Sequence, residues 1–224
     1  MNNRLLQALN VRPFLFLWLS EVFSQVAMNM LNFILLIVVF SLTNSNTAVS
    51  GIVLSFTVPA IIFGILAGVY VDRWNKKFVL LATNGIRAVL LLLLAFFHNN
   101  LFAVYTFSAL VSVATQFFIP AESPMIPLLV KKETLLSANA LFGMAIYGSI
   151  LVAYALSGPF ILFLGSTNAF LSLACLFIIA AIFVVLIQPQ QVESIVKKKS
   201  QFSASIIEEI KQTFSLILRT KEIT

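Results

Sequence analysis

The stretch Gly68-Val-Tyr-Val-Asp72-Arg73-Trp-Asn-Lys76-Lys77 decides the fold. It concentrates charges between two long apolar runs, residues 50–71 and 78–97. Inside hydrocarbon the backbone must satisfy its own polar groups within a helix, so a short charged segment between two apolar runs lies in water. The stretch therefore predicts a water-exposed connection between two membrane-spanning helices.

The composition is that of a membrane protein. Apolar residues make up 60% of the 224 residues and charged residues only 10%, against roughly a quarter in soluble domains. The net charge of +6 does not indicate nucleic acid, because the positive residues lie at the ends of the apolar runs. One cysteine, Cys175, and one histidine cannot build the usual metal sites. We expect no cofactor.

Six apolar runs are long enough to cross a bilayer, which takes about 20 helical residues. The connections between the runs are short, so consecutive spans are expected to be antiparallel neighbours. The runs are residues 14–42, 49–71, 78–97, 101–130, 138–164 and 168–187. The sequence thus predicts an all-α membrane protein with six transmembrane helices.

The chain divides into three expected parts. Residues 1–13 form an amino-terminal segment, residues 14–188 the six-helix bundle, and residues 189–224 a polar linker with an amphipathic helix at 205–219. The basic residues at the span ends fall on one side: Arg4, Arg12, Arg73, Lys76, Lys77, Lys131, Lys132, Lys197, Lys198 and Lys199. By the positive-inside rule that side, with both termini, is cytoplasmic.

Two of the expected spans carry polar residues along one side. The first span has Ser20, Glu21, Ser24, Gln25, Asn29 and Asn32, and the fourth has Tyr105, Ser108, Ser112, Thr115, Gln116 and Glu122. A polar stripe within a bilayer faces a water-filled cavity or another helix. Interhelical hydrogen bonding needs only one or two such groups, so the length of the stripes favours a cavity.

Three charged residues lie within the apolar runs. Glu21 is a candidate proton carrier or substrate counter-ion, and the alternative is a protonated or paired structural carboxylate. Arg87 could anchor a substrate or pair with a carboxylate, or its side chain could extend toward water. Glu122 lies near the cytoplasmic end of its span, where a structural role is the favoured alternative.

The sequence contains none of the usual enzyme motifs. It has no Gly-x-Ser-x-Gly, no His-Glu-x-x-His and no phosphate-binding Walker loop. We therefore expect a membrane protein that is not an enzyme.

Several motifs resemble one family, the major facilitator superfamily. The spacing Gly68-x-x-x-Asp72-Arg73-x-x-Lys76-Lys77 resembles its signature between spans two and three, and Arg87 matches an arginine common in span three. The block Pro120-Ala-Glu122, followed by residues 136–141 (LSANAL), is similar to bacterial macrolide and enterobactin efflux permeases. Gly158-Pro159 resembles the core of the antiporter motif.

The resemblance implies a transporter with alternating access, in which two six-helix bundles, each built of two inverted three-helix repeats, rock about a central site. This chain resembles the amino-terminal bundle, so a second six-helix half would be needed. The implied activity is proton-coupled export of a small amphiphilic drug or siderophore across a bacterial cytoplasmic membrane. The implied cavity residues are Glu21, Asn29, Asn32, Arg87 and Gln116, with Gly68, Asp72, Arg73, Lys76 and Lys77 as a gate. A non-transporting scaffold or inactive remnant is the alternative.

Overall fold

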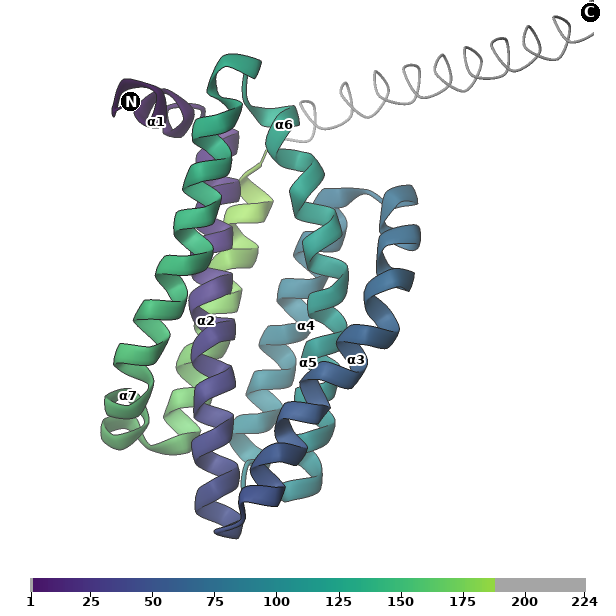
Figure 1. Ribbon diagram of the computed structural model, residues 1–224, viewed down its shortest axis with the longest axis vertical. Helices are drawn as coiled ribbons and strands as arrows, with labels where there is room; N and C mark the ends of the chain where they lie inside the picture. The colour runs from purple at the N-terminus through teal and green to yellow at the C-terminus, as the bar shows by residue number, and fades with distance from the viewer. Residues whose placement is uncertain (1, 188–224) are drawn as a thin grey trace, which may run out of the picture. The chain divides into compact units, whose positions relative to one another are not determined.

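The computed structural model describes residues 2–187 of the chain, and every regular element in this range is helical. The five long helices are α2 (Arg12–Thr43), α3 (Asn46–Arg73), α4 (Lys76–Phe97), α5 (Leu101–Glu122) and α7 (Leu135–Leu186) (Figure 1). The short elements are α1 (Asn2–Leu9), η1 (Ser123–Met125), α6 (Ile126–Leu129) and η2 (Lys132–Thr134). The expected linker and its amphipathic helix lie outside the described residues.

Polar side chains cap the first turn of three of the long helices, and two of these, α3 and α4, begin before their apolar runs. The side chain of Ser45 accepts a hydrogen bond from the backbone N–H of Ala48 at the start of α3. Asn75 and Asn100 do the same for α4 and α5. Such caps satisfy backbone donors that a helix leaves free at its first turn. The polar residues that cap a helix are outside its apolar pattern, so the sequence prediction of α3 began three residues too late.

Helix α7 contains a sharp turn that divides it into two limbs. The turn lies at Gly165, whose backbone has φ 74° and ψ 168°. The chain doubles back there, and the two limbs run in opposite directions (Figure 1). The limbs correspond to the fifth and sixth expected spans. All five long segments are long and apolar enough to cross a membrane.

Gly165→Ala is expected to destabilise the protein by about 1–3 kcal/mol, because this backbone region is accessible essentially only to glycine. Thermal unfolding of the purified chain in detergent measures the effect. Gly143→Ala is the matched control, because Gly143 lies in the helical first limb of α7 and a Cβ there would meet nothing within 4 Å. Equal stability of the two variants would contradict the role of the turn.

The fourth span differs from the uninterrupted run expected over residues 101–130. Its α-helix ends at Glu122, and η1 and the short α6 complete the run. Three prolines lie in this region, at positions 120, 124 and 127. Proline has no backbone N–H to donate and its ring crowds the preceding turn, so the closely spaced prolines account for the interruption.

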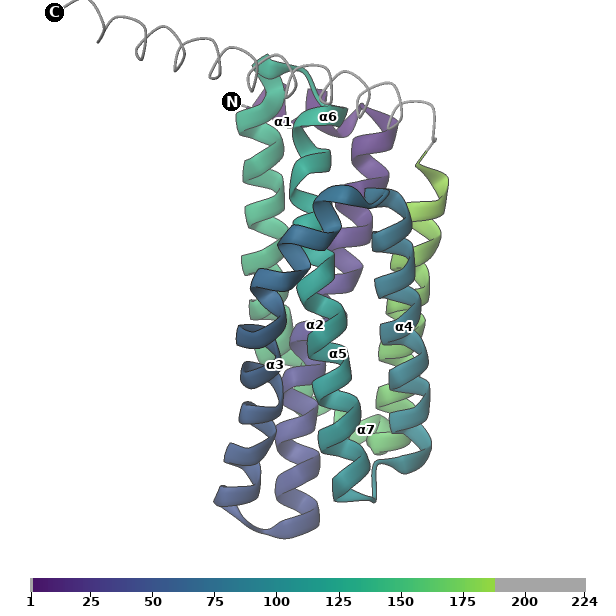
Figure 2. The ribbon, with the colours of Figure 1, turned by 90° about the vertical axis from the view of Figure 1, so that its right-hand side faces the viewer.

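The connections alternate between two ends of the bundle (Figure 2). One end holds α1, the α3–α4 connection and the segment from α6 to η2, while the opposite end holds the α2–α3 and α4–α5 connections and the turn at Gly165 (Figures 1 and 2). Consecutive spans are therefore antiparallel, as expected. Within the described range every lysine and arginine except Arg87 belongs to the first end.

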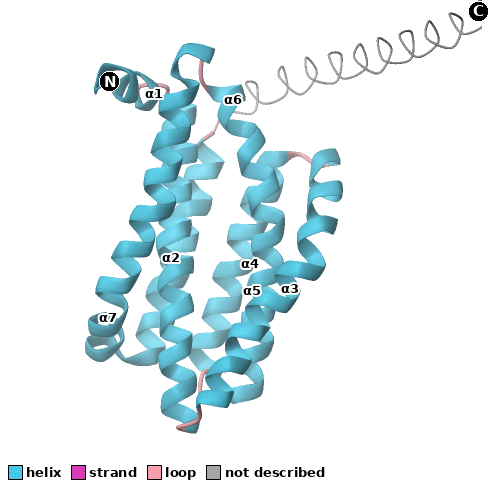
Figure 3. Cartoon of the chain, in the orientation of Figure 1, coloured by secondary structure: helices cyan, strands magenta, loops and turns pink. Residues whose placement is uncertain are grey.

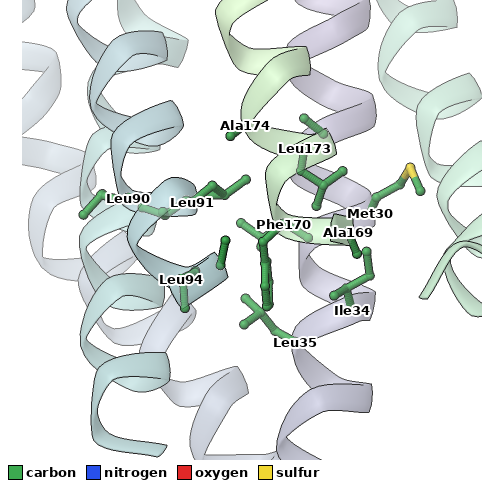
Figure 4. Packing of buried hydrophobic residues seen from close by; sticks show 14 of the residues in the cluster. Met30, Ile34, Leu35, Leu90, Leu91, Leu94, Ala169, Phe170, Leu173 and Ala174 are labelled. Atoms are coloured by element: carbon green, nitrogen blue, oxygen red, sulfur yellow. The ribbon is translucent and has the colours of Figure 1, made fainter. Parts of the chain in front are cut away.

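An apolar core joins α2, α4 and the second limb of α7 (Figure 4). Leu35, Leu91, Leu94, Phe170 and Leu173 are all fully buried there. Because lipid is as apolar as these side chains, the stabilisation comes from close van der Waals packing rather than from removal of apolar surface from water. The bundle is helical throughout its described length (Figure 3), and this rigid packing positions the polar groups considered next.

Candidate functional site

Three charged residues from three helices meet inside the bundle. Glu21 of α2, Arg87 of α4 and Glu122 of α5 have exposed fractions of only 1%, 1% and 6%. Each carboxyl group interacts with the other and with the charge of Arg87. We call Glu21, Arg87 and Glu122 the charged cluster. The structure thus brings together the three charged residues that the sequence placed within apolar runs.

The guanidinium group of Arg87 lies between two aromatic rings. Its central carbon is 4.4 Å from the ring centroid of Phe118 on α5 and 4.7 Å from that of Phe177 on α7. Such contacts stabilise a cation through the negative face of the ring. Nη2 also donates to Oδ1 of Asn84 at 2.8 Å, and Nε donates to the carbonyl oxygen of Thr83 at 3.3 Å.

The two carboxyl groups are less completely satisfied. Gln25 donates from Nε2 to Oε1 of Glu21 at 2.8 Å. The other oxygen of Glu21, Oε2, has no hydrogen-bond donor, and neither does Oε1 of Glu122. A buried polar atom without a partner is costly. Two carboxyl groups beside one guanidinium are electrically neutral when one carboxyl group is protonated, so this arrangement can hold one exchangeable proton.

The remaining candidates from the polar stripes lie outside the charged cluster. Asn29 donates from Nδ2 to Oγ of Ser149 at 2.9 Å and so connects α2 to the first limb of α7. Oδ1 of Asn32 is buried without a hydrogen-bond partner. Gln116 is half-buried, and its Oε1 would lie 3.5 Å from a Cβ built on Gly64 of α3.

Interhelical hydrogen bonds account for part of both stripes. The hydroxyl of Tyr105 donates to the carbonyl oxygen of Ala48 at 2.8 Å, and Oγ of Ser112 donates to that of Phe56 at 2.6 Å. Both bonds join α5 to α3. Hydrogen bonding between helices, the alternative to a water-filled cavity, therefore accounts for Tyr105, Ser112 and Asn29. A cavity role for Asn32 and Gln116 stays a prediction.

The lysines of the α3–α4 connection bind the ends of two helices. Lys76 donates from Nζ to the carbonyl oxygen of Val71, near the end of α3. Lys77 donates from Nζ to the carbonyl oxygens of Val185, at 2.8 Å, and of Ile187 at the end of α7. The last carbonyls of a helix have no partner within the helix and carry partial negative charge, so cations are stabilising there.

The other two charged residues of the signature are exposed. Asp72 and Arg73 face outward at the end of α3, and a Cβ at Gly68 would meet nothing within 4 Å. Gly158 and Pro159 lie exposed on the first limb of α7. A gating role for these residues, and an antiporter role for Gly158 and Pro159, stay predictions.

Lys77→Met is expected to loosen the end of α7, because two of its last carbonyl oxygens lose their charged donor. Hydrogen exchange followed by mass spectrometry should show faster exchange over residues 183–187 than in the wild type. Lys131→Met is the control, since Lys131 is exposed on the same end of the bundle. Unchanged exchange in Lys77→Met would contradict the capping role.

Sequence reasoning missed three residues around Arg87. Asn84 precedes it by three positions on the same helix and could have been found from that spacing. Phe118 and Phe177 come from other helices and are two of 22 phenylalanines in the chain. Nothing in the sequence distinguishes them from phenylalanines that only pack.

Length, composition and a charged cluster enclosed among helices define the class: a multi-pass, all-helical membrane protein. A family model described as Major Facilitator Superfamily matches residues 17–223, and the chain belongs to this family. Members of the family are membrane transporters rather than enzymes. No curated protein and no solved structure matches the chain in the corresponding comparisons.

Proposed function

We propose that the chain is one half of a proton-coupled secondary transporter that exports a small amphiphilic drug or siderophore. The observation that carries the proposal is the charged cluster, in which two buried carboxyl groups share the influence of one buried guanidinium. Ionisable residues within membrane spans are costly, and they mark ion pathways and proton relays.

Charge balance explains why the coupling ion is a proton. With both Glu21 and Glu122 ionised, the cluster carries a net negative charge in a site closed to solvent, which is strongly unfavourable. Binding one proton removes that charge and supplies a hydrogen-bond donor for a carboxyl oxygen that lacks one. Uptake of the proton on one side of the membrane and its release on the other would then drive the conformational cycle.

The packing pattern supports two inverted three-helix repeats. The first span packs against the fifth through Trp18 and Leu141, and against the sixth through Phe23 and Phe183. The fourth span packs correspondingly against the second and third, because α5 contacts both α3 and α4. Exchanging spans one to three with spans four to six therefore preserves these four contacts. Inverted repeats of this kind are typical of secondary transporters.

The exposed face of α7's first limb supports a second six-helix bundle as partner, on the same chain or another. Tyr147 and Tyr154 are 72% and 65% exposed there. The exposed positions of α4, such as Val89 and Phe96, are apolar and suit lipid. Tyrosine hydroxyls within hydrocarbon need hydrogen-bond partners. A second bundle or the water of a central cavity would supply them.

We further propose a bacterial cytoplasmic membrane as the location, with both termini in the cytoplasm. The support is the basic end of the bundle, which the positive-inside rule assigns to the cytoplasm. Residues 1–13 would then precede the six-helix bundle of residues 14–188 on the cytoplasmic side. Residues 189–224 would be a cytoplasmic linker toward the second bundle.

Proton flux in everted vesicles tests the proposal. The vesicles come from cells that produce the chain with its native flanking coding sequence, and a pH-sensitive dye reports the imposed gradient. Ethidium, erythromycin and ferric enterobactin are the probes. We expect at least one probe to discharge the gradient, with no response in vesicles that lack the protein. If a folded protein responds to none of them, the export proposal fails and a non-transporting scaffold is favoured.

A further inference from the structure

The guanidinium of Arg87 is held by aromatic rings instead of by the nearby carboxylates. Arg87 forms no direct ion pair with Glu21 or Glu122, although its charge interacts with both at longer range. It contacts Phe118 and Phe177 and donates hydrogen bonds only to Asn84 and Thr83. This is unusual, because a guanidinium normally pairs with a carboxylate through two parallel hydrogen bonds.

The separation has a chemical consequence. A direct, bidentate ion pair would neutralise one carboxylate permanently and satisfy its oxygens. The cluster would then have less need of a proton. With the guanidinium kept at a distance, the oxygens Oε2 of Glu21 and Oε1 of Glu122 have no donor. A proton is the smallest species that can satisfy them within this closed site.

We propose that Phe118 and Phe177 are positioning residues that hold Arg87 away from Glu21 and Glu122, so that the two carboxyl groups keep an exchangeable proton. The proposal rests on the proton site of the proposed function. The charged groups that face the site are Glu21 from α2, Arg87 from α4 and Glu122 from α5. The element α7 contributes Phe177 and no charged group within the span.

Fluorination of the two rings tests whether they hold Arg87, with little change in the shape of either side chain. Mono-, di- and trifluorinated phenylalanine progressively weaken the negative face of the ring on which a cation–ring contact depends. We expect the thermal unfolding temperature of the purified full chain to fall stepwise along this series at position 118 and at position 177. Phe170 is the matched control, because it is fully buried on the same limb of α7 as Phe177 and packs in the apolar core instead.

The dependence on Arg87 makes this test specific. In an Arg87→Met background the stepwise fall at positions 118 and 177 should disappear, because no cation remains between the rings. The same trend at position 170, or a trend that persists without Arg87, would show that fluorination acts through ordinary packing. Either result would overturn the proposal that the rings of Phe118 and Phe177 hold Arg87.

Infrared spectroscopy tests the consequence for the proton. At neutral pH the wild-type chain should show the carbonyl band of a protonated carboxyl group, and the double variant Glu21→Gln/Glu122→Gln should lose it. Phe118→Leu and Phe177→Leu free the guanidinium to pair with a carboxylate and should reduce the band by at least half. Phe118→Trp, which keeps an aromatic face, and Phe170→Leu should retain the band.

Adding Arg87→Met to Phe118→Leu should restore the band, since no guanidinium is left to form the ion pair. Retention of the full band in both Phe118→Leu and Phe177→Leu would overturn the positioning role alone. A wild-type chain without the band would overturn the proton site itself, and the fluorination series would still decide whether the rings hold Arg87.

Discussion

We expect Glu21→Gln to abolish proton-driven transport and to reduce probe-dependent proton flux to the level of vesicles without the protein. Glutamine has nearly the same shape as glutamate and keeps an oxygen for the hydrogen bond from Gln25, but it neither ionises nor binds a proton at physiological pH. The change therefore removes the proton site while leaving the packing between α2 and α5 in place. Flux under an imposed pH gradient is the measurement.

Glu122→Gln should have the same effect. The double variant should show the same residual proton flux as either single variant, because groups that act as a unit lose their function together. Glu133→Gln is the matched control, since Glu133 is an exposed carboxylate on η2. It should transport like the wild type. Normal flux in Glu21→Gln would remove Glu21 from the coupling mechanism, whatever the behaviour of Glu122→Gln.

Arg87→Ala is expected to destabilise the protein by about 3 kcal/mol or more, in the range found when one member of a buried charged group is removed. Arg87 is the largest of the fully buried side chains in the described part of the chain. Its loss leaves a cavity between Phe118 and Phe177 and leaves Glu21 and Glu122 without a compensating positive charge. Equilibrium unfolding in mixed micelles gives the free energy of unfolding.

Arg73→Ala separates this effect from the general loss of a positive charge. Arg73 is exposed at the end of α3, so its removal should change the free energy of unfolding by no more than about 0.5 kcal/mol. If Arg87→Ala were as stable as Arg73→Ala, the buried cluster would contribute little to the fold. The role of the aromatic rings would then need to be reconsidered.

Much of the fold could be predicted from the sequence, because membrane spans follow from local composition. The positions of the turns at Trp74, His98 and Gly165 agree with the expected breaks between apolar runs. The starts of α3 and α4 were predicted two or three residues too late, because polar residues form the first turn of each helix. The end of the fourth α-helix at Glu122 was missed, because the run of apolar residues continues through the prolines that interrupt it.

The site was predicted less completely. Glu21, Arg87 and Glu122 stand out in the sequence because charge within an apolar run is costly, whatever the fold. Their separate roles were assigned one residue at a time, with Glu122 expected near the cytoplasmic end of its span. The structure instead buries Glu122 beside Glu21. Asn29, expected in a cavity, forms a hydrogen bond between helices.

The sequence by itself determined that this is a helical membrane protein, where its spans begin and end to within a few residues, and which buried charges need an explanation. Only the tertiary structure decided that three of those charges meet, that two phenylalanines hold Arg87, and that Lys77 binds the end of α7. The physical reason is that span formation depends on the hydropathy of consecutive residues. A buried cluster depends on which faces of separate helices pack together, and no local pattern records that.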